Sequence, residues 1–450
     1  MLTIDEFRIP VDGQATLVSV VCDSLDGHKT EIDTNRSLIE LRELLRTLGI
    51  KFASQHIQNK KSIESGTFIG AGKVKEIAEA AQAEGSNLLV FDFELTASQV
   101  RNIKEITKME VVDRVTVILE IFAKHAHTKE AKLQIEISRL QYLLPRLSSM
   151  WSHFSRQKGG GGAAGGASVR GGEGEQQLEL DRRIIRERIE FYKKQLEDVE
   201  ISRKEQSKRR QNKAITAALV GYTNAGKSSL MNRLCRVNVL EENKLFATLD
   251  ATYRMLNPDT KPPMILIDTV GFISNLPNTL ISGFRTTLES AIEADLLLIV
   301  CDASDPYYEK QLSVTMEVLK ELKLEEKDKL IIFNKKDLLH DQFKEKIMLK
   351  NYPGSMMVSS LNPENMTDLR SFIINYFLDK QTHYDLFIPY EDGESHSKIM
   401  GNTNILNTVH HESGIFYRIR IPDFIFHSLK LTSFLLAPHD PGKLLLDTKI

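Results

Sequence analysis

A glycine-rich stretch near the middle of the chain, at residues 219–229, constrains the fold more than any other part of the sequence. It reads Leu-Val-Gly-Tyr-Thr-Asn-Ala-Gly-Lys-Ser-Ser and matches the pattern Gly-x4-Gly-Lys-Ser/Thr without a mismatch. The apolar residues 217–220 predict a strand before it, and a helix is expected to begin after it. Glycines in such a loop let backbone N–H groups point at phosphate oxygens, at the positive end of the helix. The stretch predicts a nucleoside triphosphate site, and the motifs that follow weaken the alternative of a glycine turn with a chance lysine.

Two side chains of this loop carry predicted chemistry. Lys227 is expected to reach the β- and γ-phosphates, and the Ser228 hydroxyl is expected to ligate Mg²⁺. The predicted nucleotide-binding residues of the loop are Gly221, Tyr222, Thr223, Asn224, Ala225, Gly226, Lys227, Ser228 and Ser229.

An apolar strand at residues 265–272 ends in the pattern Asp-x-x-Gly. Asp268 is expected to hold Mg²⁺ through water, and the Gly271 N–H is expected to sense the γ-phosphate. Residues 244–250 form a candidate first switch, in which Thr248 is expected to complete the Mg²⁺ coordination, with Thr252 as the alternative. The nucleotide-binding residues predicted here are Phe246, Ala247, Thr248, Leu249, Asp250, Asp268, Thr269, Val270 and Gly271. The predicted catalytic residues are Lys227, Thr248 and Gly271, and the predicted metal ligands are Ser228, Thr248 and Asp268.

Another buried strand, at residues 330–337, ends in Asn-Lys-x-Asp. Asp337 can accept hydrogen bonds from guanine N1–H and from the 2-amino group, which adenine does not offer. Lys335 is expected to stack over the base and Asn334 to tie the loop together, while a last strand at 357–361 can give a backbone N–H to guanine O6. The predicted base-binding residues are Asn334, Lys335, Lys336, Asp337, Ser359, Ser360 and Leu361. These motifs, in this order and spacing, predict an enzyme that hydrolyses GTP to GDP and phosphate.

The residue after Asp-x-x-Gly bears on the mechanism. Ras-like GTPases place a glutamine there to orient the attacking water, whereas this chain has Phe272. Because a phenyl ring cannot orient water by hydrogen bonding, slow hydrolysis is expected until a partner surface, another loop or an ion completes the site. Asn224 is a candidate for holding such an ion, K⁺, near the phosphates through its side-chain oxygen.

The other parts of the chain divide around this GTPase domain, which is expected to span residues 214–380. Residues 1–122 predict an α/β domain, with strands at 16–22 and 87–91 and helices at 37–48, 74–83 and 96–106. The glycine stretch at 66–74 departs from the phosphate-loop pattern, since Thr67 replaces a glycine and Val74 replaces the hydroxyl. A glycine turn that caps a helix is predicted there, with a weak nucleotide or RNA contact as the alternative. Residues 381–450 predict a small α/β domain.

Residues 123–213 predict a basic helical hairpin. Helical spacing covers 128–147 and 176–213, and between them lies a glycine-rich tip, 159–172, that cannot hold one conformation unaided. The hairpin carries 20 Lys/Arg against 12 Asp/Glu, whereas the whole chain has a net charge of -2. An arm of about 30 residues reaches about 45 Å. A solvated spacer is one interpretation, but the positive charge, Trp-Ser-His-Phe at 151–154 and Arg170 in the tip favour contact with a folded RNA surface.

Length and composition indicate the setting. A chain of 450 residues suggests about three domains. Its three cysteines lack metal-ligand spacing and indicate a reducing compartment. No run approaches the ~18 apolar residues that cross a bilayer. A cytoplasmic monomer is expected, with at most a peripheral position at a membrane.

With these motifs in view, the chain resembles the HflX family of translation-factor-class GTPases over residues 66–380. The resemblance rests on the motifs at 221–228, 245–250, 268–273 and 334–337, and on the flanking stretches at 143–147, 150–153 and 177–183. It implies a GTPase that binds the large ribosomal subunit and its rRNA, directs the arm at the peptidyl-transferase region, and splits stalled or idle ribosomes under stress. Glu173, Ala251 and Tyr253 depart from the family pattern, which bears on the conformation of the tip and the switch but not on the class.

The predicted fold class is α/β, with a P-loop GTPase domain whose sheet is mostly parallel. An α/β N-terminal domain and a long helical hairpin precede it, and a small α/β C-terminal domain follows. A GTPase for ribosome assembly or RNA modification is the alternative function, although no sequence typical of a modification or KH module is present. An RNA-binding scaffold with a vestigial nucleotide site is disfavoured, because Lys227, Ser228, Thr248 and Asp268 are all present.

Overall fold

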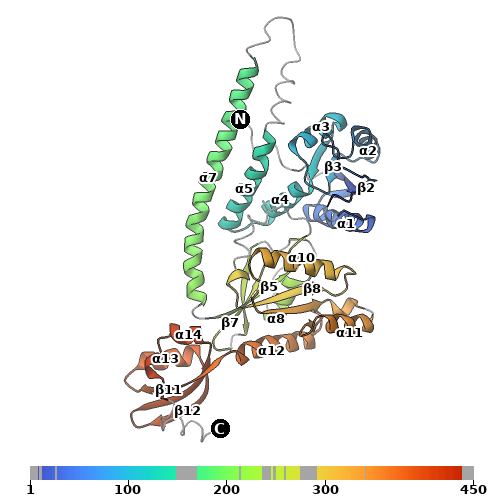
Figure 1. The fold of residues 1–450 in the computed structure, drawn as a ribbon. Coiled ribbons are helices and arrows are strands. Elements are labelled where there is room, and N and C mark those ends of the chain that lie inside the picture. Colours follow the sequence, from blue (N-terminus) through green and yellow to red (C-terminus); the bar gives the residue numbers. More distant parts are fainter. Residues whose placement is uncertain are drawn as a thin grey trace, which may run out of the picture. The chain divides into compact units, whose positions relative to one another are not determined.

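The computed structural model describes residues 9, 13–25, 28–147, 170–211, 214–235, 245–246, 250–257, 260–273, 291–339 and 341–437. The chain falls into two compact units (Figure 1). The first comprises Met1–Glu200, Glu242–Asp250 and Ile273–Thr287. The second comprises Ile201–Glu241, Ala251–Phe272 and Leu288–Ile450. Each unit is described by itself.

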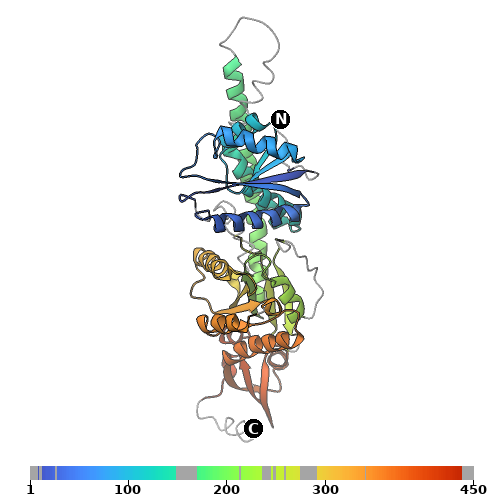
Figure 2. The ribbon, with the colours of Figure 1, turned by 90° about the vertical axis from the view of Figure 1, so that its right-hand side faces the viewer.

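The first unit is built around a parallel sheet in the order β2-β1-β3-β4. The strands are β1 (Gln14–Val21), β2 (Lys51–Asn59), β3 (Leu88–Phe91) and β4 (Glu110–Asp113). Helices α2 (Ala71–Ala83) and α3 (Ala97–Thr107) pack on one face through the cluster that contains Val18 and Val20. Helices α1 (Glu31–Leu48) and α4 (Arg114–His125) pack against each other. Figure 2 shows the sheet edge-on between the two helical layers, the cover that a parallel sheet requires.

Several predictions for this unit need correction. Helix α1 begins at Glu31 rather than residue 37, because the Thr30 side chain caps it by accepting from the Asp33 N–H. Strands β2 and β4 and helix α4 were not predicted. β2 forms an edge of the sheet, is only partly buried, and therefore lacks the continuous apolar run on which strand prediction depends. The helix start predicted in the second glycine stretch is confirmed, since Gly70 caps α2 with φ of 93°.

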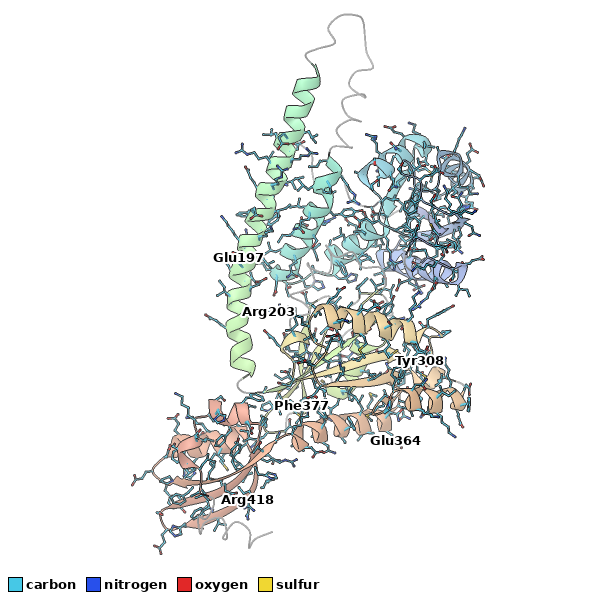
Figure 3. All side chains as sticks on the ribbon, in the orientation of Figure 1. Glu197, Arg203, Tyr308, Glu364, Phe377 and Arg418 are labelled. Carbon is cyan, nitrogen blue, oxygen red and sulfur yellow. The ribbon has the colours of Figure 1, made fainter. Side chains whose placement is uncertain are left out.

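The helical arm consists of α5 (Lys129–Leu143), the 3-10 turn η2 (Leu144–Arg146) and α7 (Arg170–Gln211). Ile137 and Leu140 of α5 pack against Ile189 of α7. Figure 3 shows the side chains along α7, with the exposed Glu197 labelled. α7 already includes residues 170–172, the last three residues of the predicted glycine-rich tip. A helix propagates more easily than it nucleates, so a long helix can extend into a glycine-containing stretch. Residues 148–169, with the rest of the predicted tip and 151–154, lie outside the described residues.

The second unit contains a six-stranded sheet in the order β10-β9-β8-β5-β7-β6. The strands are β5 (Ile215–Gly221), β6 (Thr252–Asn257), β7 (Met264–Asp268), β8 (Leu296–Asp302), β9 (Lys329–Asn334) and β10 (Met356–Met357). Every neighbouring pair is parallel except β6 with β7. The helices are α8 (Lys227–Cys235), α10 (Tyr308–Glu321), the 3-10 turn η3 (Lys336–Leu338), α11 (Gln342–Asn351) and α12 (Pro363–Asp379). The predicted α/β class with a mostly parallel sheet is confirmed, but the last strand covers only two residues and not 357–361.

A smaller antiparallel sheet, in the order β11-β13-β12, ends the second unit. Its strands are β11 (Thr382–Pro389), β12 (Asn404–His411) and β13 (Gly414–Ile421). Helices α13 (Gly393–Asn402) and α14 (Asp423–Ser428) and the turn η4 (Thr432–Phe434) accompany it. One apolar cluster runs from Leu219 on β5 through Ile373 on α12 to Ile419 on β13. The two sheets of this unit therefore share one core.

Among the described residues, no helix combines the length and apolar character needed to cross a membrane.

Candidate active site

The predicted phosphate loop joins β5 to α8, and its two glycines are required by close packing. Gly221 has φ of 148°, and a Cβ there would lie 2.2 Å from the Val300 carbonyl oxygen. Gly226 has φ of 91°, and a Cβ there would lie 2.2 Å from Asn334 Nδ2. Both φ values are costly for residues with a Cβ. The glycine pattern is thus a consequence of how the loop fits between β8 and the Asn-Lys-x-Asp segment.

Lys227 is buried at the start of α8. Its Nζ donates to the carbonyl oxygens of Tyr222 at 2.8 Å and Gly221 at 3.1 Å. Burial lowers the pKa of this amine to about 8, and the nearby Asp268 carboxylate opposes that shift. The ammonium group is therefore held beside the loop that the sequence predicts to bind phosphates.

This lowered pKa predicts a pH dependence of nucleotide binding. A phosphate group beside Lys227 would raise its pKa again, so binding would take up a proton. Because the pKa before binding is about 8, the affinity for GDP should fall by about fourfold between about pH 7 and about pH 8.5. Titration of a fluorescent GDP analogue, repeated in two buffers of different ionisation enthalpy, would measure both the affinity and the proton uptake. An affinity that stays flat over this interval would contradict the assignment.

The predicted metal ligands Ser228 and Asp268 meet at the carboxyl end of the sheet. The Ser228 hydroxyl donates to Asp268 Oδ2 at 2.7 Å, and both residues are largely shielded from solvent. Beside them, the buried Thr269 hydroxyl donates to the Leu219 carbonyl at 2.6 Å and fixes the end of β7 against β5. Hydroxyl and carboxylate oxygens are the donors that Mg²⁺ prefers, so these residues fit that ion.

Phe272 is locked against the phosphate loop. Its N–H donates to the Gly221 carbonyl at 3.0 Å, and its carbonyl accepts from the Thr223 N–H at 2.7 Å. The side chain is 3% exposed, and Val270 before it is also buried. The position after Asp-x-x-Gly thus holds a buried ring rather than a polar group that could orient water.

The predicted base-binding residues come together at the ends of β9 and β10. Asn334 is fully buried, with Nδ2 donating to the Ala225 carbonyl at 3.0 Å and Oδ1 accepting from the Ser360 N–H at 3.1 Å. The Ser359 hydroxyl donates to Asp337 and accepts from the Leu361 N–H at 3.2 Å. Asn334 therefore ties the phosphate loop to the base-binding loops.

Two lysines of the Asn-Lys-x-Asp motif have different environments. Lys335 has φ of 62°, and its Nζ lies 2.7 Å from Asp302 at the end of β8. Lys336 pairs with Glu345 on α11 at 2.7 Å, so its side chain is engaged by that helix. Sequence reasoning missed Asp302, although a carboxylate at the end of a buried parallel strand is a signal that could have identified it.

The candidate first switch is only partly described, since Ala247, Thr248 and Leu249 lie outside the described residues. Phe246 and Asp250 belong to the first unit, and the Phe246 ring lies 4.6 Å from the Phe122 ring of α4. Asp250 accepts hydrogen bonds at the start of α5. The sequence predicted nucleotide contacts for both residues and gave no sign of these packing partners.

The chain matches three family models. One is described as GTP-binding GTPase N-terminal over residues 35–123, and another as GTP-binding GTPase middle region over residues 125–210. The third is described as 50S ribosome-binding GTPase over residues 216–335.

Curated relatives and solved structures are similar over most of the chain. The GTPase HflX of Alkalihalophilus pseudofirmus is 39% identical over 381 residues, or 84% of this chain and 88% of the relative. That of Akkermansia muciniphila is 37% identical, covering 94% and 97%, and that of Escherichia coli is 35% identical, covering 87% and 89%. A GTP-binding protein from the archaeon Sulfolobus solfataricus, solved in complex with GDP, aligns over 80% of this chain and 98% of that chain with 25% identity and a TM-score of 0.42.

Proposed function

Because the chain belongs to the HflX family of GTPases, we propose that it binds the large ribosomal subunit, hydrolyses GTP in response, and splits or rescues stalled or idle ribosomes under stress. The observation that carries this proposal is the buried Phe272. A GTPase without a polar group at this position needs a partner surface, another loop or an ion to complete water activation. A partner surface would make the rate of hydrolysis depend on the partner rather than on the loop alone.

We assign each residue of the site the role that its motif predicts. Lys227 and the loop N–H groups neutralise phosphate charge, and the Gly271 N–H and Thr248 respond to the γ-phosphate. Ser228, Thr248 and, through water, Asp268 would hold Mg²⁺, which would stabilise negative charge on the phosphates. Asp337 selects guanine, and Lys335 covers the base.

The arm supports rRNA as the partner. α7 is about 63 Å long at about 1.5 Å per residue. Its described cations include Arg183, Arg186 and Lys193, which pair with glutamates of the same helix. Exposed pairs of this kind contribute little, so these cations can exchange their partners for phosphates.

GTP turnover with and without purified large subunits, combined with sucrose-gradient profiles of whole ribosomes, tests the proposal. Stimulated turnover and a shift from whole ribosomes to subunits are the expected results. A GTP turnover rate that is the same with and without large subunits, together with no cosedimentation, would overturn the ribosomal role. The assignment as a GTPase would stand. Cosedimentation with subunit precursors but not with mature subunits would favour an assembly function instead.

Removing residues 159–169 separates the arm's role from that of the nucleotide site. α7 begins at Arg170, so the deletion leaves this helix whole. GTP binding should be retained and ribosome splitting lost, as measured by nucleotide titration and gradient profiles of the same preparation. Splitting at the full rate would refute the role of the tip.

We also propose that K⁺ assists hydrolysis at Asn224, which is exposed in the loop and has φ of 59°. Turnover should be higher in K⁺ than in Na⁺ at equal ionic strength. Asn224→Gly keeps access to this backbone conformation but removes the side-chain oxygen, so it should abolish the difference. Equal turnover of the unaltered chain in the two salts would exclude this role.

A further inference from the structure

The candidate first switch has a residue that packs within the first unit on each side of Thr248 in the sequence. Residues 242–250 group with the N-terminal α/β domain and α5, whereas Ala251 and the following β6 belong to the second unit. The described ends of the segment, Phe246 and Asp250, make different kinds of contact. Thr248 lies between these two anchors in the sequence.

The first anchor is apolar. The Phe246 side chain is 3% exposed, and its ring meets that of the fully buried Phe122 edge-on, with 4.6 Å between centroids. Phe246 also has φ of 57°, a left-handed conformation that is rare for a bulky residue. Such a conformation persists where the surroundings over-determine it, which indicates that the packing on α4 holds this end of the segment.

The second anchor is polar and lies at the start of α5. Asp250 Oδ2 accepts from the His127 N–H at 3.0 Å and the Thr128 N–H at 3.2 Å, and its Oδ1 accepts from the Thr128 hydroxyl at 2.6 Å. The same hydroxyl caps α5 by accepting from the Ala131 N–H at 3.2 Å. A carboxylate is favoured beside the positive end of a helix. Asp250 therefore orients the capping hydroxyl and stabilises the first turn of α5.

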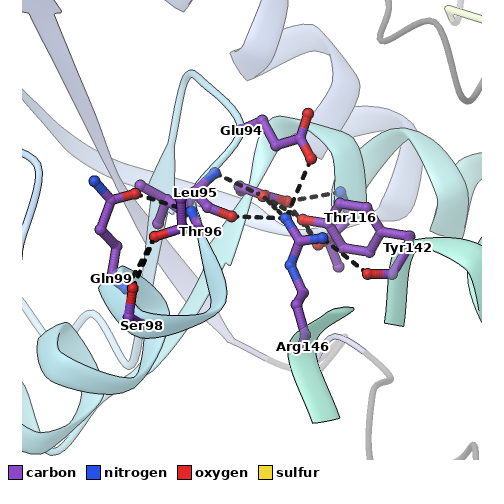
Figure 4. A network of polar contacts seen from close by, with 9 residues as sticks. Glu94, Leu95, Thr96, Ser98, Gln99, Thr116, Tyr142 and Arg146 are labelled. Atoms are coloured by element: carbon purple, nitrogen blue, oxygen red, sulfur yellow. Dashed lines mark hydrogen bonds and ion pairs between the residues drawn. The ribbon is translucent and has the colours of Figure 1, made fainter. Parts of the chain in front are cut away.

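The other end of α5 is held by the network shown in Figure 4. The Tyr142 hydroxyl donates to Asp113, and burial raises the pKa of Tyr142 well above its usual range. Arg146 stacks on the Tyr142 ring at 3.4 Å and donates to the Leu95 carbonyl at 2.6 Å. Since α5 also packs on α7 through Ile137 and Leu140, a change at the first turn of α5 can reach α7.

Asp250 is connected to the predicted nucleotide site through the chain itself. Asp250 is followed by Ala251 and then by Thr252, which pairs with Asp268 across β6 and β7. Asp268 in turn accepts the hydrogen bond from Ser228. Two peptide units thus separate the cap of α5 from the edge of the nucleotide site.

We propose that Asp250 is a positioning residue that couples the nucleotide state of the first switch to the first turn of α5, and through α5 to α7. The inference rests on the proposed switch function of residues 244–250, but it does not require the ribosome. When the γ-phosphate draws the switch toward the nucleotide, the Asp250 contacts to His127 and Thr128 are altered, and the capping hydroxyl of Thr128 loses its fixed orientation.

Hydrogen–deuterium exchange of the full chain, without ribosomes, tests this coupling. Amides of residues 129–136 should exchange at rates that differ by about three- to tenfold between saturating GDP and a non-hydrolysable GTP analogue. Asp250→Ala should reduce this difference to less than about twofold, because the cap no longer senses the switch. Equal exchange in the two nucleotide states of the unaltered chain would overturn the proposal, as would a full difference that survives in Asp250→Ala.

A second variant removes the Thr128 side of the contact between Asp250 and Thr128. Thr128→Ala removes the hydroxyl that Asp250 and Ala131 share but lies outside the predicted nucleotide-binding residues, and it should also erase the difference. Thr96→Ala is the matched control, because it removes the capping box of α3 in the same unit. It should speed exchange in α3 and leave the nucleotide-dependent difference in α5 intact. A ribosomal assay that fails while this pattern holds would reject the proposed partner and keep the coupling.

Discussion

Asp337→Asn is expected to lower the affinity for GTP by about 10²–10³-fold and to raise the affinity for xanthosine triphosphate by a similar factor. The carboxylate of Asp337 accepts from guanine N1–H and the 2-amino group in our assignment, whereas an amide would place a donor against that amino group. Xanthine carries an oxygen at the same carbon and can accept from the amide. The Ser359 hydroxyl, which donates to Asp337, can still donate to an amide oxygen and hold it in place.

Competition of GTP and xanthosine triphosphate against a labelled nucleotide would measure this exchange of specificity. Asp341→Asn is a matched control in the following loop, because Asp341 caps α11 and asparagine caps helices equally well. It should leave both affinities within about twofold. If Asp337→Asn weakens both nucleotides alike, Asp337 supports the loop instead of reading the base.

The sequence predicted the central strands of the second unit well because those strands are buried on both faces. β5 and β7 are almost entirely apolar and end at glycine or aspartate, so both could be predicted as strands from local pattern. β2 and β4 lie at the edges of their sheet and are short or polar, which left no pattern to detect. α7 was predicted as a helix, but its start within a glycine-containing stretch depends on helix propagation, which composition does not reveal.

The candidate site also contains a part that the sequence could predict and a part that it could not. Lys227, Ser228, Asp268 and Asn334 lie in short motifs whose spacing follows from backbone geometry, and the structure brings them to one edge of the sheet. The contact of Asp250 with Thr128 joins residues more than a hundred positions apart. Nothing in either local sequence specifies the other, so this contact could be found only in the folded chain. The same applies to the burial that lowers the pKa of Lys227.

Gly271→Ala is expected to lower the rate of GTP hydrolysis by about 10²–10³-fold, with a much smaller effect on GDP affinity. A Cβ at this position would lie 2.7 Å from Thr223 Cα and 2.9 Å from Lys227 Nζ. The lysine can move, but Thr223 Cα is backbone, so residue 271 itself would have to move away from the phosphate loop. The N–H of residue 271 would then be displaced from the place where we expect the γ-phosphate to be sensed.

Single-turnover hydrolysis and equilibrium titration with GDP separate the two effects. Gly393→Ala serves as the matched control, because a Cβ at Gly393 would meet nothing within 4 Å, and both quantities should be unchanged. Gly271 is expected to face the γ-phosphate, which GDP lacks. The substitution should therefore lower the rate of GTP hydrolysis and leave GDP affinity nearly unchanged. If GDP affinity falls as far as the hydrolysis rate does, the methyl group has deformed the whole phosphate loop, and Gly271 serves to pack against Thr223 rather than to sense the γ-phosphate.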